Sequence, residues 1–148
     1  MPIPPLEPSG LLPAGIHDCS LDEIQARFGV FRGSEARPRL FERLRDLITA
    51  MRRSGLFEAV LVDGSFVTRK AVPNDMDLLA VLSRGHDFER DLPISEYALV
   101  SRALLRRRFG FDVVVAEKNG PVYETYVEFF SRVRDAPGLR KGILRISL

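Results

Sequence analysis

Hydrophobic positions repeat every three or four residues in two stretches of the chain, which is the period of an α-helix with one buried face. The first stretch predicts a helix that begins at Ser34 or Pro38 and ends at Ser54, where Gly55 stops it. Its apolar positions are Leu40, Phe41, Leu44, Leu47, Ile48 and Met51. The second stretch predicts a helix over about 122–133.

Local signals indicate two further helices. Ser20 and Glu23 form a capping-box pattern, in which each side chain satisfies a free backbone N–H of the other residue. A short helix should therefore open at Ser20 and end near Gly29. Another helix is expected over about 95–108, before Gly110.

Short apolar runs that are too brief for helices predict strands over 57–62, 75–82 and 111–116. The last residues, 141–148, are expected to add a strand at the edge of the sheet. Helices and strands in this order predict an α/β (α+β) fold with a small mixed β-sheet flanked by helices.

The length of 148 residues fits one globular domain. Within it we expect two parts. Residues 1–33 form a proline-rich arm, extended to about residue 19, with the short helix after it. Residues 34–148 form the main domain.

The composition, with 45% hydrophobic and 28% charged residues, is that of a globular protein and argues against disorder. No apolar run reaches the ~18 residues that a membrane helix needs, so we expect no membrane partner. Prolines interrupt the N-terminal region, which has no Lys or Arg before Arg27, so a secretory signal is not expected. One cysteine excludes an internal disulfide. Cytoplasmic localisation is the resulting expectation.

Arginines gather in short clusters, although the net charge is only +2. We interpret the clusters as solvated helix faces, with the last cluster at the C-terminal end of a helix, where cations suit the dipole. The alternative is a surface for an anionic partner, either RNA or an acidic protein. The clusters are Arg37, Arg39, Arg43 and Arg45; Arg52 and Arg53; and Arg106, Arg107 and Arg108.

Three aspartates occupy predicted strands, where aspartate is disfavoured. Asp75 and Asp77 are two positions apart and should point to the same face of the sheet, while Asp112 lies in another strand beside three valines. Like charges this close repel unless a cation lies between them. Carboxylate oxygens suit Mg²⁺ or Mn²⁺, and a third carboxylate allows two ions to be held side by side.

Gly64 and Ser65 follow the strand 57–62, at a predicted junction between strand and helix. A glycine there lets the backbone approach a phosphate, whose oxygens the next N–H groups and the Ser65 hydroxyl can bind. We expect Asp63, just before the glycine, to cap a turn. The following Thr68, Arg69 and Lys70 lie in a connecting loop, where they either reach phosphate oxygens or form an exposed basic loop.

The segment DGSFVTRKAVPNDMDLLAVL (63–82), with Asp112 in FGFDVVVA (109–116), resembles the signature of the polymerase-β-like nucleotidyltransferase superfamily. Gly64 and Ser65 match its Gly-Ser element, Asp75 and Asp77 its metal pair, and Asp112 its third carboxylate. The segments 12–17 and 65–75 resemble small bacterial nucleotidyltransferase-like proteins. Residues 34–148 are therefore expected to be a nucleotidyltransferase-like domain, without the additional helical domain of larger members.

The resemblance implies transfer of an NMP, with AMP from ATP as the expected case, from an NTP to an acceptor hydroxyl. Asp75, Asp77 and Asp112 would be the catalytic and metal residues, holding Mg²⁺ or Mn²⁺, and Asp112 would accept the hydroxyl proton. Gly64, Ser65, Thr68, Arg69 and Lys70 would bind the nucleotide. The acceptor would be a protein or tRNA, such as a protein encoded next to this one in a bacterial toxin–antitoxin-like module.

Two alternatives remain open. Asp63 adds a negative charge near the phosphate cradle, and no acceptor-binding domain is evident, so the chain is alternatively an inactive nucleotidyltransferase fold that binds a nucleotide or a partner. A third reading is an RNA-binding protein that acts through the arginine clusters, which predicts a steeply salt-dependent affinity.

Overall fold

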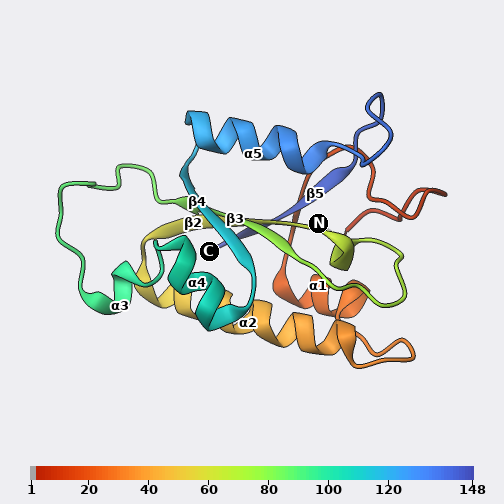
Figure 1. Ribbon diagram of the computed structural model, residues 1–148, viewed down its shortest axis with the longest axis horizontal. Coiled ribbons are helices and arrows are strands. Elements are labelled where there is room, and N and C mark those ends of the chain that lie inside the picture. Colours follow the sequence, from red (N-terminus) through yellow and green to blue (C-terminus); the bar gives the residue numbers. More distant parts are fainter. Residues whose placement is uncertain (1–2) are drawn as a thin grey trace.

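The computed structural model describes residues 3–148 and has three layers, with helices on both faces of one sheet (Figure 1). Helices α1 (Leu21–Phe28), α2 (Ala36–Ser54) and α4 (Arg102–Phe109) lie below the sheet in that view, and α5 (Pro121–Ser131) lies above it. A single turn, α3 (Ile94–Tyr97), precedes α4. None of the helices within residues 3–148 is both long and apolar enough to cross a membrane.

The sheet has five strands in the order β1-β5-β2-β3-β4. Its members are β1 (Gly15–Cys19), β2 (Phe57–Asp63), β3 (Asp77–Leu82), β4 (Asp112–Glu117) and β5 (Gly142–Ser147). The pairs β1–β5 and β3–β4 are parallel, whereas β2 is antiparallel to both of its neighbours. The predicted α+β class with a small mixed sheet is thereby confirmed.

Most of the predicted elements are present, and three of them differ from the prediction in extent or position. The helix expected over 95–108 is broken, because Ser101 adopts an extended conformation and accepts a hydrogen bond from the Leu104 N–H, so that α4 starts anew. The strand expected from residue 75 begins at Asp77. The C-terminal strand, expected at an edge, is internal, because the unpredicted strand β1 pairs with its free side.

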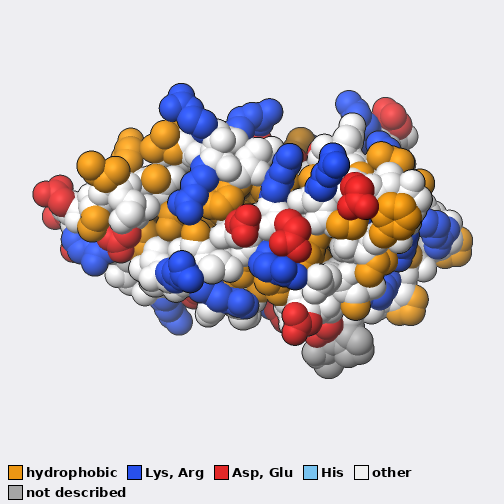
Figure 2. Space-filling model, turned by 90° about the horizontal axis from the view of Figure 1, so that it is seen from below, with side chains coloured by type: hydrophobic (Ala, Val, Ile, Leu, Met, Phe, Trp, Pro, Cys, Tyr) orange, Lys and Arg blue, Asp and Glu red, His pale blue; other side chains and the backbone are white. Residues whose placement is uncertain are grey.

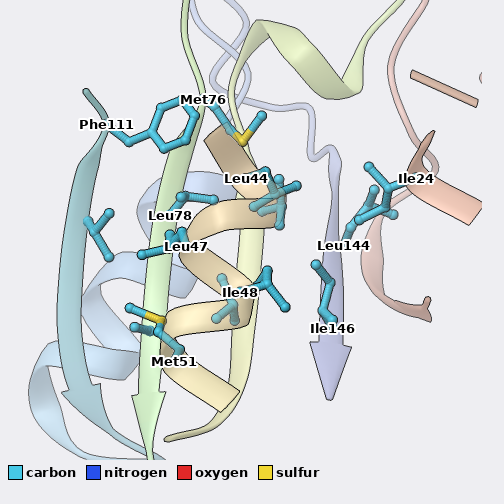
Figure 3. Close-up of a cluster of buried hydrophobic side chains, with 14 of the residues drawn as sticks. Ile24, Leu44, Leu47, Ile48, Met51, Met76, Leu78, Phe111, Leu144 and Ile146 are labelled. Carbon is cyan, nitrogen blue, oxygen red and sulfur yellow. The ribbon is translucent and has the colours of Figure 1, made fainter. Parts of the chain in front are cut away.

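The main core lies between the sheet and the lower helices (Figure 3). Helix α2 turns Leu44, Leu47, Ile48 and Met51 toward the strands, and each of these side chains is fully buried. This is the stripe that the three-and-four spacing predicts, since residues at those separations share one helix face. Removing such large apolar side chains from water supplies most of the stabilisation of the fold.

The arm is packed against this body from residue 3 onward. Ile3 and Leu12 are buried in the same core as the lower helices. The Arg27 guanidinium donates a hydrogen bond of 2.7 Å to the Ile3 carbonyl, and Arg69 donates to the carbonyl of Glu7 at 3.2 Å. The arm is therefore bound along its length by arginine side chains and by two apolar anchors.

The clustered arginines on the helices are exposed or, for Arg45, half-buried, as interpreted from their clustering, with one exception. The exposed ones include Arg39, Arg43, Arg52, Arg53, Arg106, Arg107 and Arg108. On the lower face, Figure 2 shows Lys and Arg side chains among acidic, apolar and uncharged ones. Binding of RNA by these clusters stays a prediction.

The exception is Arg37, of which only 1% is exposed, so its assignment to a solvated face was wrong. Its guanidinium donates hydrogen bonds to four carbonyls, those of Phe28, Phe66, Thr68 and Lys70, at 3.2, 2.7, 2.8 and 2.5 Å. It also lies over the rings of Phe28 and Phe66. One side chain of α2 thus holds the whole connection that follows β2.

We predict that Arg37→Met lowers the free energy of unfolding by about 3 kcal/mol or more, because four carbonyls lose a charged donor, at two of them in a buried environment. The exposed neighbour Arg39, in the same helix, provides the matched control, and Arg39→Met should change stability by less than about 0.5 kcal/mol. Urea denaturation of both variants measures the difference. Equal effects would contradict the role assigned to Arg37.

Candidate active site

The sheet register aligns three carboxylates across neighbouring strands. Asp77 is the partner of Asp63 on β2 and of Asp112 on β4. Residues directly opposite one another point to the same face of a sheet, and here it is the face that α5 covers further along the strands. We call these three residues the acid row. Asp77 and Asp112 were predicted to be neighbours, whereas Asp63 was not assigned to the site.

The turn that follows β2 is packed tightly against the segment that leads into β3. Gly64 has φ of 94°, and a Cβ there would lie 3.0 Å from the Asp75 carbonyl oxygen, the Asp77 nitrogen and the Met76 Cα. Only glycine fits both the backbone angle and the space. The short 3₁₀ turn η1 (Ser65–Val67) starts directly after it. Close contact between two chain segments, rather than access for a phosphate, thus accounts for the glycine in this structure.

Ser65 ties the turn to Asp75, which lies exposed in the loop just before β3. The Ser65 backbone N–H donates to an Asp75 carboxylate oxygen at 3.0 Å, and its hydroxyl donates to the same oxygen. The hydroxyl oxygen also accepts a hydrogen bond from the Asn74 N–H at 3.2 Å. The two donors that were expected to bind a phosphate therefore hold a carboxylate instead.

Asp77 is the half-buried centre of the acid row. No hydrogen bond or ion pair formed within residues 3–148 reaches its carboxylate. Burial raises the pKa of Asp77, and the nearby negative charges of Asp75 and Asp112 raise it further, while Lys141 opposes the shift. The site thus contains a carboxylate that an added cation would stabilise.

Asp112, the expected third metal ligand, is bound by an arginine. The Arg102 guanidinium donates from Nε and Nη2 to the two Asp112 oxygens, both at 2.7 Å, and lies 3.4 Å from the Tyr126 hydroxyl of α5. These hydrogen bonds lower the pKa of Asp112. Within residues 3–148, no three His, Cys, Asp or Glu side chains are arranged to hold a metal ion.

Asp63 is the last residue of β2 rather than the turn cap that we expected, and only 3% of it is exposed. Its carboxylate lies 3.2 Å from the Lys141 ammonium, just before β5. Burial raises the pKa of Asp63 to about 6, although Lys141 acts in the opposite direction. The sequence contained a signal for this role of Asp63, because the residue directly follows the apolar run of a strand that is buried on both faces.

The remaining nucleotide-binding candidates, Thr68, Arg69 and Lys70, make different contacts in the structure. The Thr68 hydroxyl donates to the Ser65 carbonyl at 2.7 Å and stabilises the turn. Arg69 is exposed, but it is bound to the arm through the carbonyls of Glu7 and Pro8. Lys70 has an exposed side chain, and its carbonyl accepts from Arg37. Of the three, Lys70 has the side chain best placed to meet a ligand from solvent.

Gly64→Ala is predicted to lower the free energy of unfolding by about 2 kcal/mol or more, because the added methyl group meets backbone atoms and φ is in the left-handed region. Gly138 supplies the control, since nothing lies within 4 Å of a Cβ built there. Thermal unfolding of Gly64→Ala and Gly138→Ala makes the comparison. An unaffected Gly64→Ala protein would show that the turn is not tightly packed.

The Asp63–Lys141 pair predicts a pH-dependent stability. With a folded pKa of about 6, Asp63 retains a proton that the unfolded chain has lost, so its contribution to stability declines as pH rises from about 4 to about 6. Removing the compensating cation in Lys141→Met should therefore destabilise the protein more at about pH 8 than at about pH 5.

Urea denaturation in metal-free buffer at the two pH values tests this expectation. The exposed Lys70 serves as the control, and Lys70→Met should show no such pH dependence. An equal loss at both pH values in Lys141→Met would contradict the assignment of the ion pair.

Comparison with known proteins gives one family match, to a family of unknown function, DUF6932, over residues 4–147. No curated protein and no solved structure matches the chain. Because the match spans nearly the whole sequence, the chain belongs to the family of unknown function DUF6932.

Proposed function

We propose that this protein is a metal-dependent nucleotidyltransferase, which transfers an NMP from an NTP, with ATP as the expected donor, to a hydroxyl of a protein or RNA. The observation that carries the proposal is the joining of the Gly64–Ser65 turn to the Asp75–Asp77 segment, at the end of the acid row. This arrangement agrees with the polymerase-β-like nucleotidyltransferase signature that the sequence resembles.

The carboxylates fit a divalent cation by their chemistry. Asp75 is exposed, and Asp77 has a raised pKa and receives no hydrogen bond from the described residues, 3–148. Oxygen donors of this kind are preferred by Mg²⁺ and Mn²⁺. A bound ion would neutralise phosphate charge and favour ionisation of the acceptor hydroxyl. Asp75 and Asp77 would hold it, and Asp112 would join them once released from Arg102.

The contacts of Ser65 suggest how nucleotide and metal binding are coupled. Its N–H and hydroxyl now donate to Asp75. A phosphate oxygen that accepts from the same two donors would replace the Asp75 carboxylate, which would then be free to bind the ion. Triphosphate binding at the turn and metal binding at Asp75 would therefore support each other.

Arg102 occupies the Asp112 carboxylate, as Ser65 occupies that of Asp75. While it is bound to Arg102, Asp112 has a lowered pKa and is a poor proton acceptor. Arg102 begins α4 and is exposed, so its guanidinium is free to turn toward an incoming phosphate. Its departure would leave Asp112 to accept the proton of the acceptor hydroxyl.

A second candidate function is a nucleotide- or partner-binding module without turnover. It is favoured by the two cations already present in the acid row, Arg102 on Asp112 and Lys141 on Asp63. Both would stabilise the carboxylates without a metal. Metal-dependent NTP binding in calorimetry, with no transfer to any acceptor, would support this alternative.

The nature of the acceptor follows from the resemblance alone. The small members that this chain resembles are similar to the modifying partner or antitoxin of bacterial two-gene modules, in which the acceptor is a protein Tyr, Ser or Thr side chain or a tRNA end. We propose the same class of acceptor for this protein, including a protein encoded next to it.

Incubation with α-labelled ATP, Mg²⁺ and cell lysate tests the proposal. The wild-type protein is expected to label a protein or RNA band, and Asp75→Asn/Asp77→Asn should reduce labelling by about 10²-fold or more, since the metal carboxylates are lost. Asp46→Asn, which changes an exposed carboxylate on α2, is the control and should label normally. Equal labelling by wild type and the double variant would refute the proposed activity.

A further inference from the structure

A cavity of about 320 Å³ lies on the α5-covered face of the sheet, away from the acid row. Its floor is formed by apolar side chains of β2 and β3, and Tyr123 from the first turn of α5 forms a wall. The floor residues are Ala59, Leu61 and Val81. Its acidic residues are Asp18 and Glu58. Glu58 is five positions from Asp63, which corresponds to roughly 17 Å along the strand, whereas Leu61 of the floor is two positions from Asp63. This volume is within the range of small-molecule sites.

Glu58 enters this cavity because of an irregularity in β2. Phe57 pairs with Leu82 and Ala59 with Val81, so two steps on β2 match one step on β3. Such a bulge leaves the extra residue unpaired and redirects its side chain. Within the described residues, 3–148, the buried Glu58 Oε1 atom has no hydrogen-bond partner. A buried carboxylate oxygen without a donor is rare in folded proteins, and a donor group of a bound ligand would satisfy it.

Two cationic side chains, Lys118 and Arg145, line the same cavity as Glu58. Arg145 of β5 is already bound by Asp18 through two hydrogen bonds, of 2.5 and 2.8 Å. Lys118, just after β4, makes no ion pair within residues 3–148 and is exposed. The cavity therefore offers one unpaired acceptor and one unpaired cation, above an apolar floor.

A second cavity, of about 450 Å³, adjoins the first and shares Glu58 and Lys118 with it. The two charged side chains therefore stand where the cavities meet, and a ligand bound between them has room to extend. Over the first cavity the charges of Glu58 and Asp18 balance those of Lys118 and Arg145. The negative charge of a polyphosphate would be repelled by the Glu58 carboxylate. A ligand that carries one positive and one negative group would not be repelled, because its positive group can face Glu58.

We propose that this cavity binds a small zwitterion with an apolar body, in the size class of a free amino acid. Its ammonium group donates to Glu58, its carboxylate lies against Lys118, and its side chain covers the apolar floor beside Tyr123. The site is separate from the acid row, and its assignment does not depend on the proposed nucleotidyl transfer.

The test is a titration of the full chain with the common L-amino acids, one at a time, followed by ¹H–¹⁵N NMR. At least one amino acid with an apolar side chain is expected to shift the amide signals of Ala59 and Tyr123 with a Kd below about 1 mM. Its N-acetyl and amide derivatives, each lacking one charge, should bind at least about tenfold more weakly. Equal binding of these derivatives would assign the site to a different ligand class and overturn the proposal.

Matched variants locate the binding. Glu58→Gln and Lys118→Met should each raise the Kd at least about tenfold, with the NMR spectrum confirming that each variant is folded. Glu128→Gln and Lys70→Met change exposed charges elsewhere and should bind like the wild type. Asp77→Asn should also bind normally, whatever its effect on nucleotidyl transfer. Absence of saturable binding up to about 10 mM, or normal binding by both cavity variants, would overturn the proposal.

Discussion

The buried guanidinium of Arg37 is the interaction on which the candidate site depends. It spans the layer between α2 and the chain that leaves β2, and it satisfies carbonyls at residues 66, 68 and 70 that have no strand or helix partner. Backbone carbonyls buried in a loop are costly unless a donor reaches them. Because one planar group reaches several of them, Arg37 fixes the path of a segment that is mostly without regular secondary structure.

The positions of the acid-row side chains depend on this segment. The connection fixed by Arg37 begins at the Gly64 turn, and the turn packs on the backbone of the 75–77 segment. Asp75 and Asp77 are thus positioned from the N-terminal side by a loop and from the other side by the register of β3 with its neighbours. The resulting concentration of negative charge is stabilised by Arg102 and Lys141, which come from α4 and from the segment before β5. These two cations offset only part of the charge of Asp63, Asp75, Asp77 and Asp112, so the site retains negative charge that a further cation would stabilise.

The sequence predicted what local patterns control. The spacing of Leu44, Leu47 and Ile48 defined α2, and the apolar runs defined β2, β3 and β4, because side-chain periodicity is a local property. The sequence also predicted that Asp77 and Asp112 lie close together, because they were assigned to neighbouring strands. Strand β1 was not predicted, because residues 15–19 form no apolar run and the strand pairs with β5, at the opposite end of the chain. The pairing of Asp63 with Lys141 was not predicted either, because these two residues are also far apart in the sequence.

Arg37 shows how a residue type can mislead. Its charge and its arginine neighbours indicated a solvated cluster, yet it is in phase with Leu40, Phe41 and Leu44 on the buried stripe of α2. Position on the helix, rather than charge, was the informative signal. The carbonyls that make its burial favourable belong to a loop whose path no local pattern predicts.

The most direct test of the central claim is a crystal structure of the protein with Mn²⁺ and a non-hydrolysable ATP analogue, with the metal located by its anomalous signal. The account predicts an Mn²⁺ peak between the carboxylates of Asp75 and Asp77, with the triphosphate on the Ser65 N–H and hydroxyl in place of Asp75. A structure in which Asp75 keeps its hydrogen bonds to Ser65, and metal and nucleotide bind elsewhere or not at all, would contradict it.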